Sequence, residues 1–302
     1  MNILITGGSG LTGRRLSEML MQQGHKVFWL GRQKNVHETI PSFYWDPEKN
    51  YIDEKALEKA DRIIHLAGMS INQRWTKKNK QQIIDSRVKT ARMIFDALSR
   101  MGKHPEAFIS ASAAGYYGTY TSDKIFTETD KPANDFTGTV CRLWEEQARL
   151  FSTAGIRTVI LRSGVVLSTR GGALQKMMVP VKAGFGVPAG TGKQYFPWIH
   201  IDDLCRLYIK AIEDRSMEGP YNAVAPEHLT NAEFMRALCR VMKKPFRQFS
   251  VPPLLMKLFF GEMSVLLLEG SRLSCRKAIE TGFTFEFPDI DTALTDLLAE
   301  KK

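Results

Sequence analysis

The sequence Met1-Asn2-Ile3-Leu4-Ile5-Thr6-Gly7-Gly8-Ser9-Gly10-Leu11-Thr12-Gly13 joins a short apolar strand to a glycine-rich turn, and an amphipathic helix follows it. The spacing of Gly7, Gly10 and Gly13 suits a dinucleotide pyrophosphate, because glycines permit a tight turn, close backbone approach and close helix packing. The helix N-terminus adds unpaired N–H groups and the positive end of its dipole. We therefore predict nucleotide binding, with a structural glycine turn as the alternative, by Gly7, Ser9, Gly10, Leu11, Thr12 and Gly13.

Strand-like and helix-like segments then alternate along the first half of the chain. Predicted strands cover Asn2–Thr6, Lys26–Leu30, Ser42–Trp45, Arg62–Leu66, Ala107–Ala111 and Thr158–Leu161. Predicted helices cover Leu11–Gln23, Glu54–Glu58, Lys77–Arg100 and Gly138–Ala154. This alternation, with short continuous apolar strands, is typical of an α/β protein with a Rossmann doubly wound parallel sheet.

The rhythm loosens after about residue 163, where glycine pairs and prolines break the chain into shorter elements. We predict a Rossmann domain that binds NADP over residues 1–165, to which later segments return. A smaller, partly interleaved C-terminal substrate domain is predicted over residues 166–302, including a small C-terminal domain from about residue 250.

Composition excludes several classes of function. The net charge is +10, but the basic residues are scattered, so we expect a solvated surface and no nucleic-acid partner. The most apolar run, Val251–Leu268, contains two prolines and charged residues, which predicts a buried helical hairpin and no membrane contact. The four cysteines lie far apart, so we expect neither a metal site nor disulfides. A strand that starts at residue 2 leaves no room for a signal peptide, and we expect a cytoplasmic location.

The end of the second strand indicates which cofactor is bound. NAD-binding proteins of this type place a carboxylate there for the ribose 2′-hydroxyl, whereas Phe28–Gln33 contains none. Arg32 is placed to bind a 2′-phosphate through charge-assisted hydrogen bonds, and the alternative is an ordinary surface arginine. We predict NADP(H).

Four motifs resemble the extended short-chain dehydrogenase/reductase superfamily of nucleotide-sugar epimerases and dehydratases. They are the segments 6–13, 61–68, 110–118 and 198–204. The resemblance implies that Leu66, Ala67 and Gly68 lie along the adenosine side of the cofactor. Further segments narrow the resemblance to an atypical, epimerase-like branch that is often described as cell-division-inhibitor-like. These segments are Trp75, Ile84–Thr90, Trp144-Glu145, Leu161–Leu167 and Gly190–Gln194. The tail, from Ser271-Arg272-Leu273 to Pro288, resembles that branch's small C-terminal domain of unknown function.

The chain departs from this superfamily in its catalytic residues. The resemblance implies a Tyr-x-x-x-Lys pair, but Phe136 and Val140 stand at those positions, and Ala113 stands at the serine position. The lysine normally lowers the pKa of the tyrosine, and without it a tyrosine keeps a pKa of about 10 and stays protonated at pH 7. Such a tyrosine can donate a proton during carbonyl reduction but cannot serve as the base for alcohol oxidation.

Candidate proton donors are Tyr117, Tyr116 and Ser112, because ligands of open α/β sheets bind at the carboxyl ends of the strands. The alternative for the two tyrosines is packing in a turn. Trp75, Gln194 and Trp198 are predicted to wall a substrate pocket, with core packing as the alternative for the tryptophans. Three further residues are weighed. His200 is expected to be structural, and Arg87 to be a phosphate ligand or an ion-pair partner. Glu145 is an acid/base candidate only if it points inward, with an ion pair to a nearby arginine as the more common role.

Three functions remain open at this stage. The first is an atypical NADP-binding oxidoreductase that favours reduction of a small carbonyl substrate. The second is a non-catalytic NADP(H)-binding sensor or scaffold with a protein partner. The third is a nucleotide-sugar epimerase or dehydratase, which the missing tyrosine and lysine oppose. The substrate, the reaction direction and the oligomeric state do not follow from the sequence.

Overall fold

The first strand, β1 (Asn2–Thr6), is covered on both faces, and this explains its continuous apolar sequence. Ile3 and Ile5 point into one apolar cluster, whereas Leu4 points into another on the opposite face. Successive side chains of a strand alternate between faces, so a strand between two helical layers must be apolar throughout. The structure is a computed structural model that describes residues 1–33, 37 and 39–299.

Around β1, eight strands of the described residues form the main sheet, in the order β11–β8–β6–β5–β1–β2–β3–β4. Neighbouring strands are parallel, except that β3 and β4 are antiparallel. The strand order reverses at β1, as in a doubly wound Rossmann sheet. The other strands are β2 (Lys26–Gly31), β3 (Ser42–Asp46), β4 (Tyr51–Ile52), β5 (Arg62–His65), β6 (Ala107–Ala113), β8 (Arg157–Ser163) and β11 (Gly219–Ala223).

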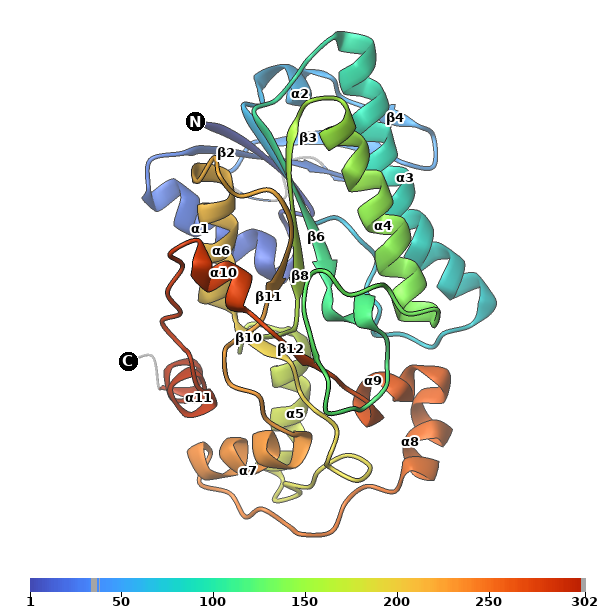
Figure 1. Ribbon diagram of the computed structural model, residues 1–302, viewed down its shortest axis with the longest axis vertical. Helices are drawn as coiled ribbons and strands as arrows, with labels where there is room; N and C mark the ends of the chain where they lie inside the picture. The colour runs from blue at the N-terminus through green and yellow to red at the C-terminus, as the bar shows by residue number, and fades with distance from the viewer. Residues whose placement is uncertain (34–36, 38, 300–302) are drawn as a thin grey trace.

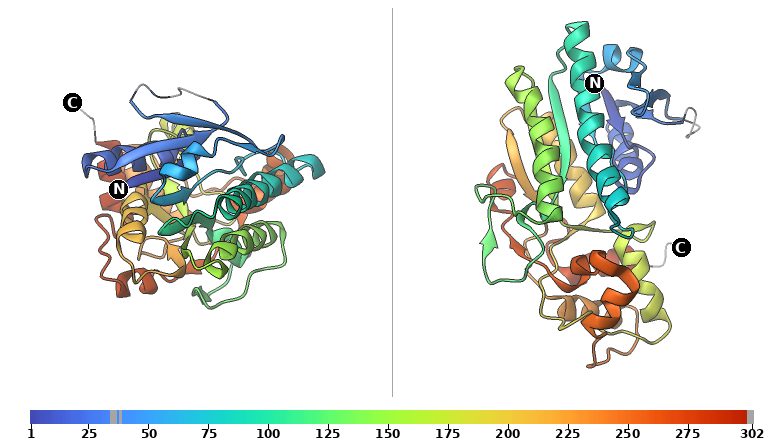
Figure 2. Two further views of the ribbon diagram at one scale, coloured as in Figure 1. Left: turned by 90° about the horizontal axis from the view of Figure 1, so that it is seen from above. Right: turned by 90° about the vertical axis from the view of Figure 1, so that its right-hand side faces the viewer.

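Helices cover both faces of this sheet (Figures 1 and 2). On one face lie α1 (Leu11–Gln22) and α6 (Ile201–Glu213), joined by Arg15, whose Nε and Nη2 donate to the Asp202 carboxylate at 2.6 and 2.7 Å. On the other face, α3 (Lys77–Met101) and α4 (Phe136–Thr153) run side by side, with the short α2 (Lys55–Lys59) nearby. The fold class expected from the sequence is confirmed.

The element boundaries differ from the sequence prediction by a few residues. Helix α4 begins at Phe136, two residues before the predicted start, because the Asp135 carboxylate accepts a hydrogen bond from the Gly138 amide at 2.8 Å and caps the helix there. Strands β6 and β8 both extend two residues further than predicted, to Ala113 and Ser163, since these residues still pair with each other.

The second half of the chain is divided between the sheet and a separate region. Helix α6 packs on the sheet, and strand β11 joins its edge. Helices α7 (Asn231–Val241) and α11 (Ile290–Leu298) pack against each other in a separate apolar cluster. The C-terminal strand β12 (Arg272–Leu273) pairs with β7 (Ile125–Phe126), so the tail docks against the loop that follows β6. The remaining elements are the 3-10 helices η1 (Ala114–Tyr117) and η2 (Gly261–Ser264), the strands β9 (Val165–Leu167) and β10 (Trp198–His200), and the helices α5 (Gly172–Lys182), α8 (Pro253–Phe260), α9 (Val265–Leu268) and α10 (Arg276–Glu280).

The prediction that Val251–Leu268 forms a buried helical hairpin is wrong. The segment folds as α8, η2 and α9, but in α8 only Met256 is buried. Leu254, Leu258 and Phe259 keep 77%, 70% and 69% of their surface exposed. An apolar sequence does not show how much of a helix packs against the rest of the protein, and α8 buries only Met256. In the part of the chain that the structure describes, no helix is long and apolar enough to span a membrane.

Candidate functional site

The turn after β1 leaves backbone amides free at the start of α1. Gly7 adopts a φ of +70°, which favours glycine, and its carbonyl accepts from the Gly10 amide at 3.0 Å. Gly10 then caps α1 without any side-chain hydrogen bond, and the first turn of the helix contains no acidic residue. The amides of that turn and the positive end of the helix dipole are therefore available to an anion.

The other glycines of this turn allow close packing. A Cβ on Gly13 would lie 2.5 Å from the Gly7 carbonyl oxygen, and a Cβ on Gly8 would lie 2.2 Å from the ring of Trp29. Both distances are far below van der Waals contact, so any larger residue would push the helix or the indole away. At Gly10 the nearest atom would be 3.2 Å away, and its φ of −74° suits any residue. Of these three, Gly10 is thus the one at which a side chain would meet the fewest atoms of the chain.

A cavity of about 470 Å³ opens beside this turn. Arg32, just beyond β2, lines it, is exposed, and forms no ion pair with any described residue. The cavity thus has helix-terminal amides near one side and an available guanidinium on its wall, which suits a phosphorylated nucleotide. Its lining residues are Gly7, Gly8, Ser9, Trp29, Leu30, Gly31, Arg32, Gln33 and Ser42.

The segment after β5 lies against the same turn. A Cβ on Gly7 would be 3.0 Å from the Ala67 amide nitrogen, and that amide donates to the Thr6 hydroxyl at 3.2 Å. His65 supports this arrangement from below, with its ring nitrogens 2.8 and 3.3 Å from the hydroxyls of Thr6 and Thr90. Burial lowers the pKa of His65 to about 3, so the ring is neutral at pH 7. Leu66, Ala67 and Gly68 thus adjoin the turn that the sequence assigns to the cofactor.

A buried polar network occupies the carboxyl end of β6. The Glu145 carboxylate accepts from Ser112 at 2.8 Å, and it forms a bidentate pair with Arg162, each bond 2.8 Å long. Arg162 also donates to the Tyr117 hydroxyl at 2.8 Å, and this hydroxyl donates to Asn222 at 2.7 Å. All five side chains are at most 2% exposed, so the pair sits in a low-dielectric environment where each charge requires the other.

This network uses two of the three candidate proton donors. Tyr117 is already bonded through its hydroxyl on both sides, and burial raises its pKa above the ordinary value. Ser112 already donates to Glu145. Tyr116 differs: its ring lies under Arg162, whose guanidinium carbon is 3.4 Å from the ring centroid, and its hydroxyl bonds to no described residue. The Tyr116 oxygen is therefore not fully buried, and it keeps some contact with solvent.

The positions of the missing Tyr-x-x-x-Lys pair are filled by apolar packing. Val140 is buried in a cluster with Trp75, Ile83 and Met263, and Phe136 packs on it. The rings of Trp75 and Phe136 meet edge to face, with centroids 4.8 Å apart. Met263 comes from the C-terminal region, so that region packs where the superfamily resemblance places a catalytic lysine.

The three residues predicted to wall a substrate pocket are not brought together. Trp75 belongs to the cluster around Val140, whereas Trp198 is 1% exposed in the core beneath α5 and α7. Gln194 is 3% exposed and donates to the carbonyls of Ala189 and Leu267 at 3.0 and 2.7 Å. Their geometry fits packing and chain crosslinking, and their assignment to a pocket stays a prediction.

Other weighed residues have structural partners. His200 caps α6 by accepting from the Asp202 amide at 3.1 Å, as expected of a structural residue. Glu145 does point inward, where it pairs with Arg162. Arg87 forms no ion pair with a described residue: it donates to the carbonyls of Met69 and Ile83 at 3.0 Å and stacks on Trp144.

Sequence reasoning missed Arg162 and Asn222 as members of the network. Arg162 could have been noticed, because it directly follows the apolar strand Thr158–Leu161, and an arginine in a buried strand needs a buried partner. Asn222 offered none. No group of three or more metal-ligating side chains occurs among residues 1–33, 37 and 39–299, and the four cysteines are free and buried.

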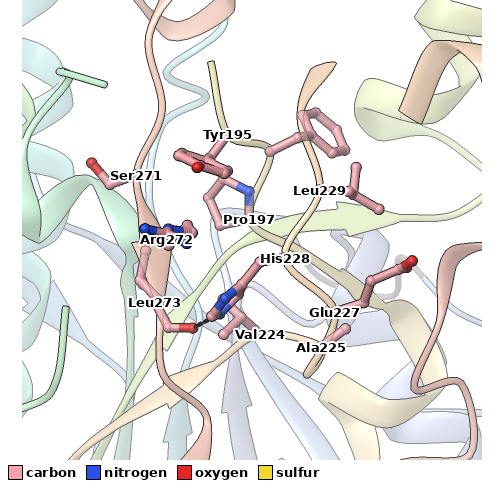
Figure 3. A pocket seen from close by; sticks show the side chains of 11 residues that line it. Tyr195, Pro197, Val224, Ala225, Glu227, His228, Leu229, Ser271, Arg272 and Leu273 are labelled. Carbon is pink, nitrogen blue, oxygen red and sulfur yellow. Dashed lines mark hydrogen bonds between the residues drawn. The ribbon is translucent and has the colours of Figure 1, made fainter. Parts of the chain in front are cut away.

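A second cavity, drawn in Figure 3, lies where the tail docks. Its volume is about 10 Å³, which is room for about one water molecule and not for a substrate. His228 points across it to the Leu273 carbonyl at 2.9 Å, and the Arg272 guanidinium lies 4.7 Å from the centroid of the Tyr195 ring. This cavity lies at the junction of the tail with residues 195–229.

The parallel sheet that reverses at β1, with a glycine turn and a free helix N-terminus at that point, defines a dinucleotide-binding Rossmann protein. Residues 3–224 match the NAD dependent epimerase/dehydratase family, and residues 251–297 match a domain of unknown function, DUF1731. The chain therefore belongs to the NAD dependent epimerase/dehydratase family. The resemblance seen in the sequence, including that of the tail, is confirmed.

Relatives cover the whole chain. The epimerase family protein YfhF of Bacillus subtilis is 37% identical over 100% of this chain and 99% of its own length. The mouse epimerase family protein SDR39U1 is 33% identical over 99% and 100%. The crystal structure of human SDR39U1 (isoform 2) with NADPH has a TM-score of 0.87 and 30% identity, over 98% of this chain and 99% of that one. The UDP-glucose 4-epimerase of Thermus thermophilus with NAD, at 20% identity and a TM-score of 0.78, shows the shared fold.

Proposed function

We propose that this chain is an NADP(H)-dependent oxidoreductase that reduces a small carbonyl compound. The observation that carries the cofactor part is the cavity beside the glycine turn. Arg32 lines its wall and pairs with no described carboxylate, and no carboxylate stands at the end of β2. A bound NADPH would supply a hydride. Gly7 to Gly13 would hold its pyrophosphate and Arg32 its 2′-phosphate, and the NADPH in the human relative supports this choice.

The proposed direction of the reaction follows from the proton donors and acceptors that the chain offers. Val140 stands where a lysine would convert a tyrosine into a base, and it is buried among apolar side chains. Oxidation of an alcohol therefore lacks its proton acceptor, whereas reduction needs only a donor. Tyr116 is the donor we propose, because its hydroxyl forms no hydrogen bond with a described residue, whereas those of Tyr117 and Ser112 are hydrogen-bonded. Arg162 and Glu145 position its ring.

Turnover of NADPH with a panel of aldehydes and ketones tests this proposal. We expect Tyr116→Phe to lower kcat by about 100-fold, which is within the usual range for loss of a general acid. Tyr117→Phe is the matched control: it should lower the free energy of unfolding, since two buried hydrogen bonds are lost, and change kcat much less. Equal turnover by the Tyr116→Phe variant and the parent protein would exclude Tyr116.

A second function, a non-catalytic NADP(H)-binding sensor or scaffold, is favoured by one observation. The apolar packing of Phe136, Val140, Trp75 and Met263 closes the position at which the superfamily resemblance places the reacting side chains. No turnover with any carbonyl compound, together with NADPH binding and a recoverable protein partner, would support this function. Nucleotide-sugar epimerisation is disfavoured, because its oxidation step needs the same missing base.

We also propose a cytoplasmic location. The four cysteines are all free and buried, which fits a protein folded in a reducing compartment. Fractionation of cells that recovers the chain with cytoplasmic proteins or on the cytoplasmic face of a membrane would support this location, and recovery from another compartment would contradict it.

A further inference from the structure

Helix α8 exposes an unusual amount of apolar surface. Leu254, Leu258 and Phe259 are 69% to 77% exposed, and Leu255 and Phe260 are partly exposed beside them. Leu254 and Leu258 are one turn apart, so their side chains are neighbours on one side of the helix, and Met256 packs inward. Helix α8 lies at the periphery of the molecule, at the lower right of Figure 1. An apolar patch of this kind marks an interaction surface.

The patch continues into the chain that precedes α8. Phe249 is 63% exposed, and Phe185, on an adjacent segment, is 62% exposed. The two segments are held together by the Arg247 amide, which donates to the Gly186 carbonyl at 2.8 Å, and by the Gly190 amide, which donates to Val251 at 3.0 Å. We name residues 183–193 and 241–261 together the α8 surface.

The charge of the α8 surface is of one sign. It contains five cationic residues and no aspartate or glutamate, in a chain with 32 acidic residues. None of the five forms an ion pair with a described residue, and the carboxylate that follows the surface, Glu262, pairs with Lys80 of α3. The cations are Lys193, Lys243, Lys244, Arg247 and Lys257.

We propose that the α8 surface binds the face of an anionic lipid bilayer. Exposed leucine and phenylalanine side chains of a peripheral helix can enter the boundary between headgroups and acyl chains, while the exposed lysine and arginine side chains of the same surface contact anionic headgroups. A second copy of this chain fits less well, because two copies meeting through this surface would bring ten cations together without a carboxylate. The proposal places the protein on the membrane surface, since none of the described helices is long and apolar enough to span a membrane. This proposal replaces the sequence expectation of no membrane contact, which rested on the burial of Val251–Leu268.

Co-sedimentation of the full chain with vesicles tests the proposal. One set of vesicles is phosphatidylcholine alone, and the other contains about one third phosphatidylserine. We expect binding to the anionic set only, and weaker binding at high salt, because the Debye length shrinks to about 3 Å at 1 M. No binding to either set, or equal binding to both, would overturn the proposal.

Two variants locate the surface. Leu258→Ser with Phe259→Ser should weaken vesicle binding at least about tenfold, and Ile279→Ser, which alters a 46% exposed side chain on α10, should not. The double variant Lys243→Gln, Lys244→Gln should also weaken vesicle binding. Its control is Lys49→Gln with Lys55→Gln, at exposed positions in the β3–β4 turn and at the start of α2, which should leave vesicle binding unchanged. Circular dichroism and thermal unfolding show that each variant is folded. Light scattering could instead reveal a dimer that is lost in the Leu258→Ser, Phe259→Ser variant. Such a dimer, together with no vesicle binding, would overturn the proposal and assign the surface to a second copy of the chain.

Discussion

The glycine turn after β1 and the carboxyl end of β6 are neighbouring parts of one sheet edge, yet they are built in opposite ways. At the glycine turn, the groups suited to a ligand are backbone amides and one exposed arginine, and they are left unpaired beside a cavity of about 470 Å³. At the end of β6, the polar side chains are paired with each other and buried. The first region is organised to receive a ligand, and the second mainly holds the fold together while leaving one tyrosine hydroxyl unbonded.

The strongest test of this contrast is to break the buried network. Glu145→Ala should lower the free energy of unfolding by about 3–5 kcal/mol, because it leaves the Arg162 guanidinium buried without its carboxylate. The matched control is Glu146→Ala, one residue away, whose carboxylate pairs with Arg142 on the exposed side of the same helix and should contribute about 0–1 kcal/mol. Urea unfolding measures both. Similar losses in the two variants would show that the network is not a structural centre.

The next test fills the ligand side of the glycine turn. Gly10→Val should lower NADPH affinity by more than about 100-fold with little loss of stability, since the backbone there suits any residue and the new side chain would occupy the ligand space. Gly13→Val should instead destabilise the protein by about 1–3 kcal/mol or more, because its Cβ would collide with the Gly7 carbonyl. Fluorescence titration and thermal unfolding separate the two effects. A Gly10→Val variant that binds NADPH normally would move the site elsewhere.

A smaller effect is expected from the cofactor choice. Arg32→Ala should weaken NADPH binding by about 10- to 100-fold, the effect of losing charge-assisted hydrogen bonds, and leave NADH binding unchanged. Arg14 is a useful control, because it lies on α1 beside the turn, donates to the Ser9 carbonyl and does not line the cavity. Arg14→Ala should therefore affect both cofactors alike. Equal affinities of the parent protein for NADPH and NADH would contradict the role of Arg32.

The last test concerns the support beneath the glycine turn. His65 has a pKa of about 3 in the folded protein and about 6.5 when unfolded, so between these values the unfolded chain binds more protons. The contribution of His65 is complete above pH 6.5 and is lost as the pH falls towards 3, by about 1.4 kcal/mol per pH unit at most. His65→Asn should flatten the dependence of unfolding free energy on pH between 6.5 and 5, and His104→Asn, at an exposed position, should not. An unchanged slope in the His65 variant would show that the ring is protonated or solvated in the folded state.

The sequence by itself determined the Rossmann sheet and the place of the cofactor turn. Both depend on local pattern: apolar runs such as Ile3–Ile5 must lie in a sheet covered on both sides, and glycines at 7, 10 and 13 fix backbone groups whose geometry needs no distant partner. The loss of the Tyr-x-x-x-Lys pair was equally visible, because it depends on the identity of two residues. For the same reason Arg32 could be singled out from its place after β2.

Only the tertiary structure decided what the remaining polar and apolar groups do. Ser112, Glu145, Arg162 and Asn222 come from β6, α4, β8 and β11, and their spacing in the sequence carries no sign that they meet. The exposure of α8 was hidden in the same way, since hydropathy states how apolar a helix is and not whether another element covers it. Backbone motifs are local and can be predicted, whereas burial and side-chain pairing are properties of contacts between distant segments.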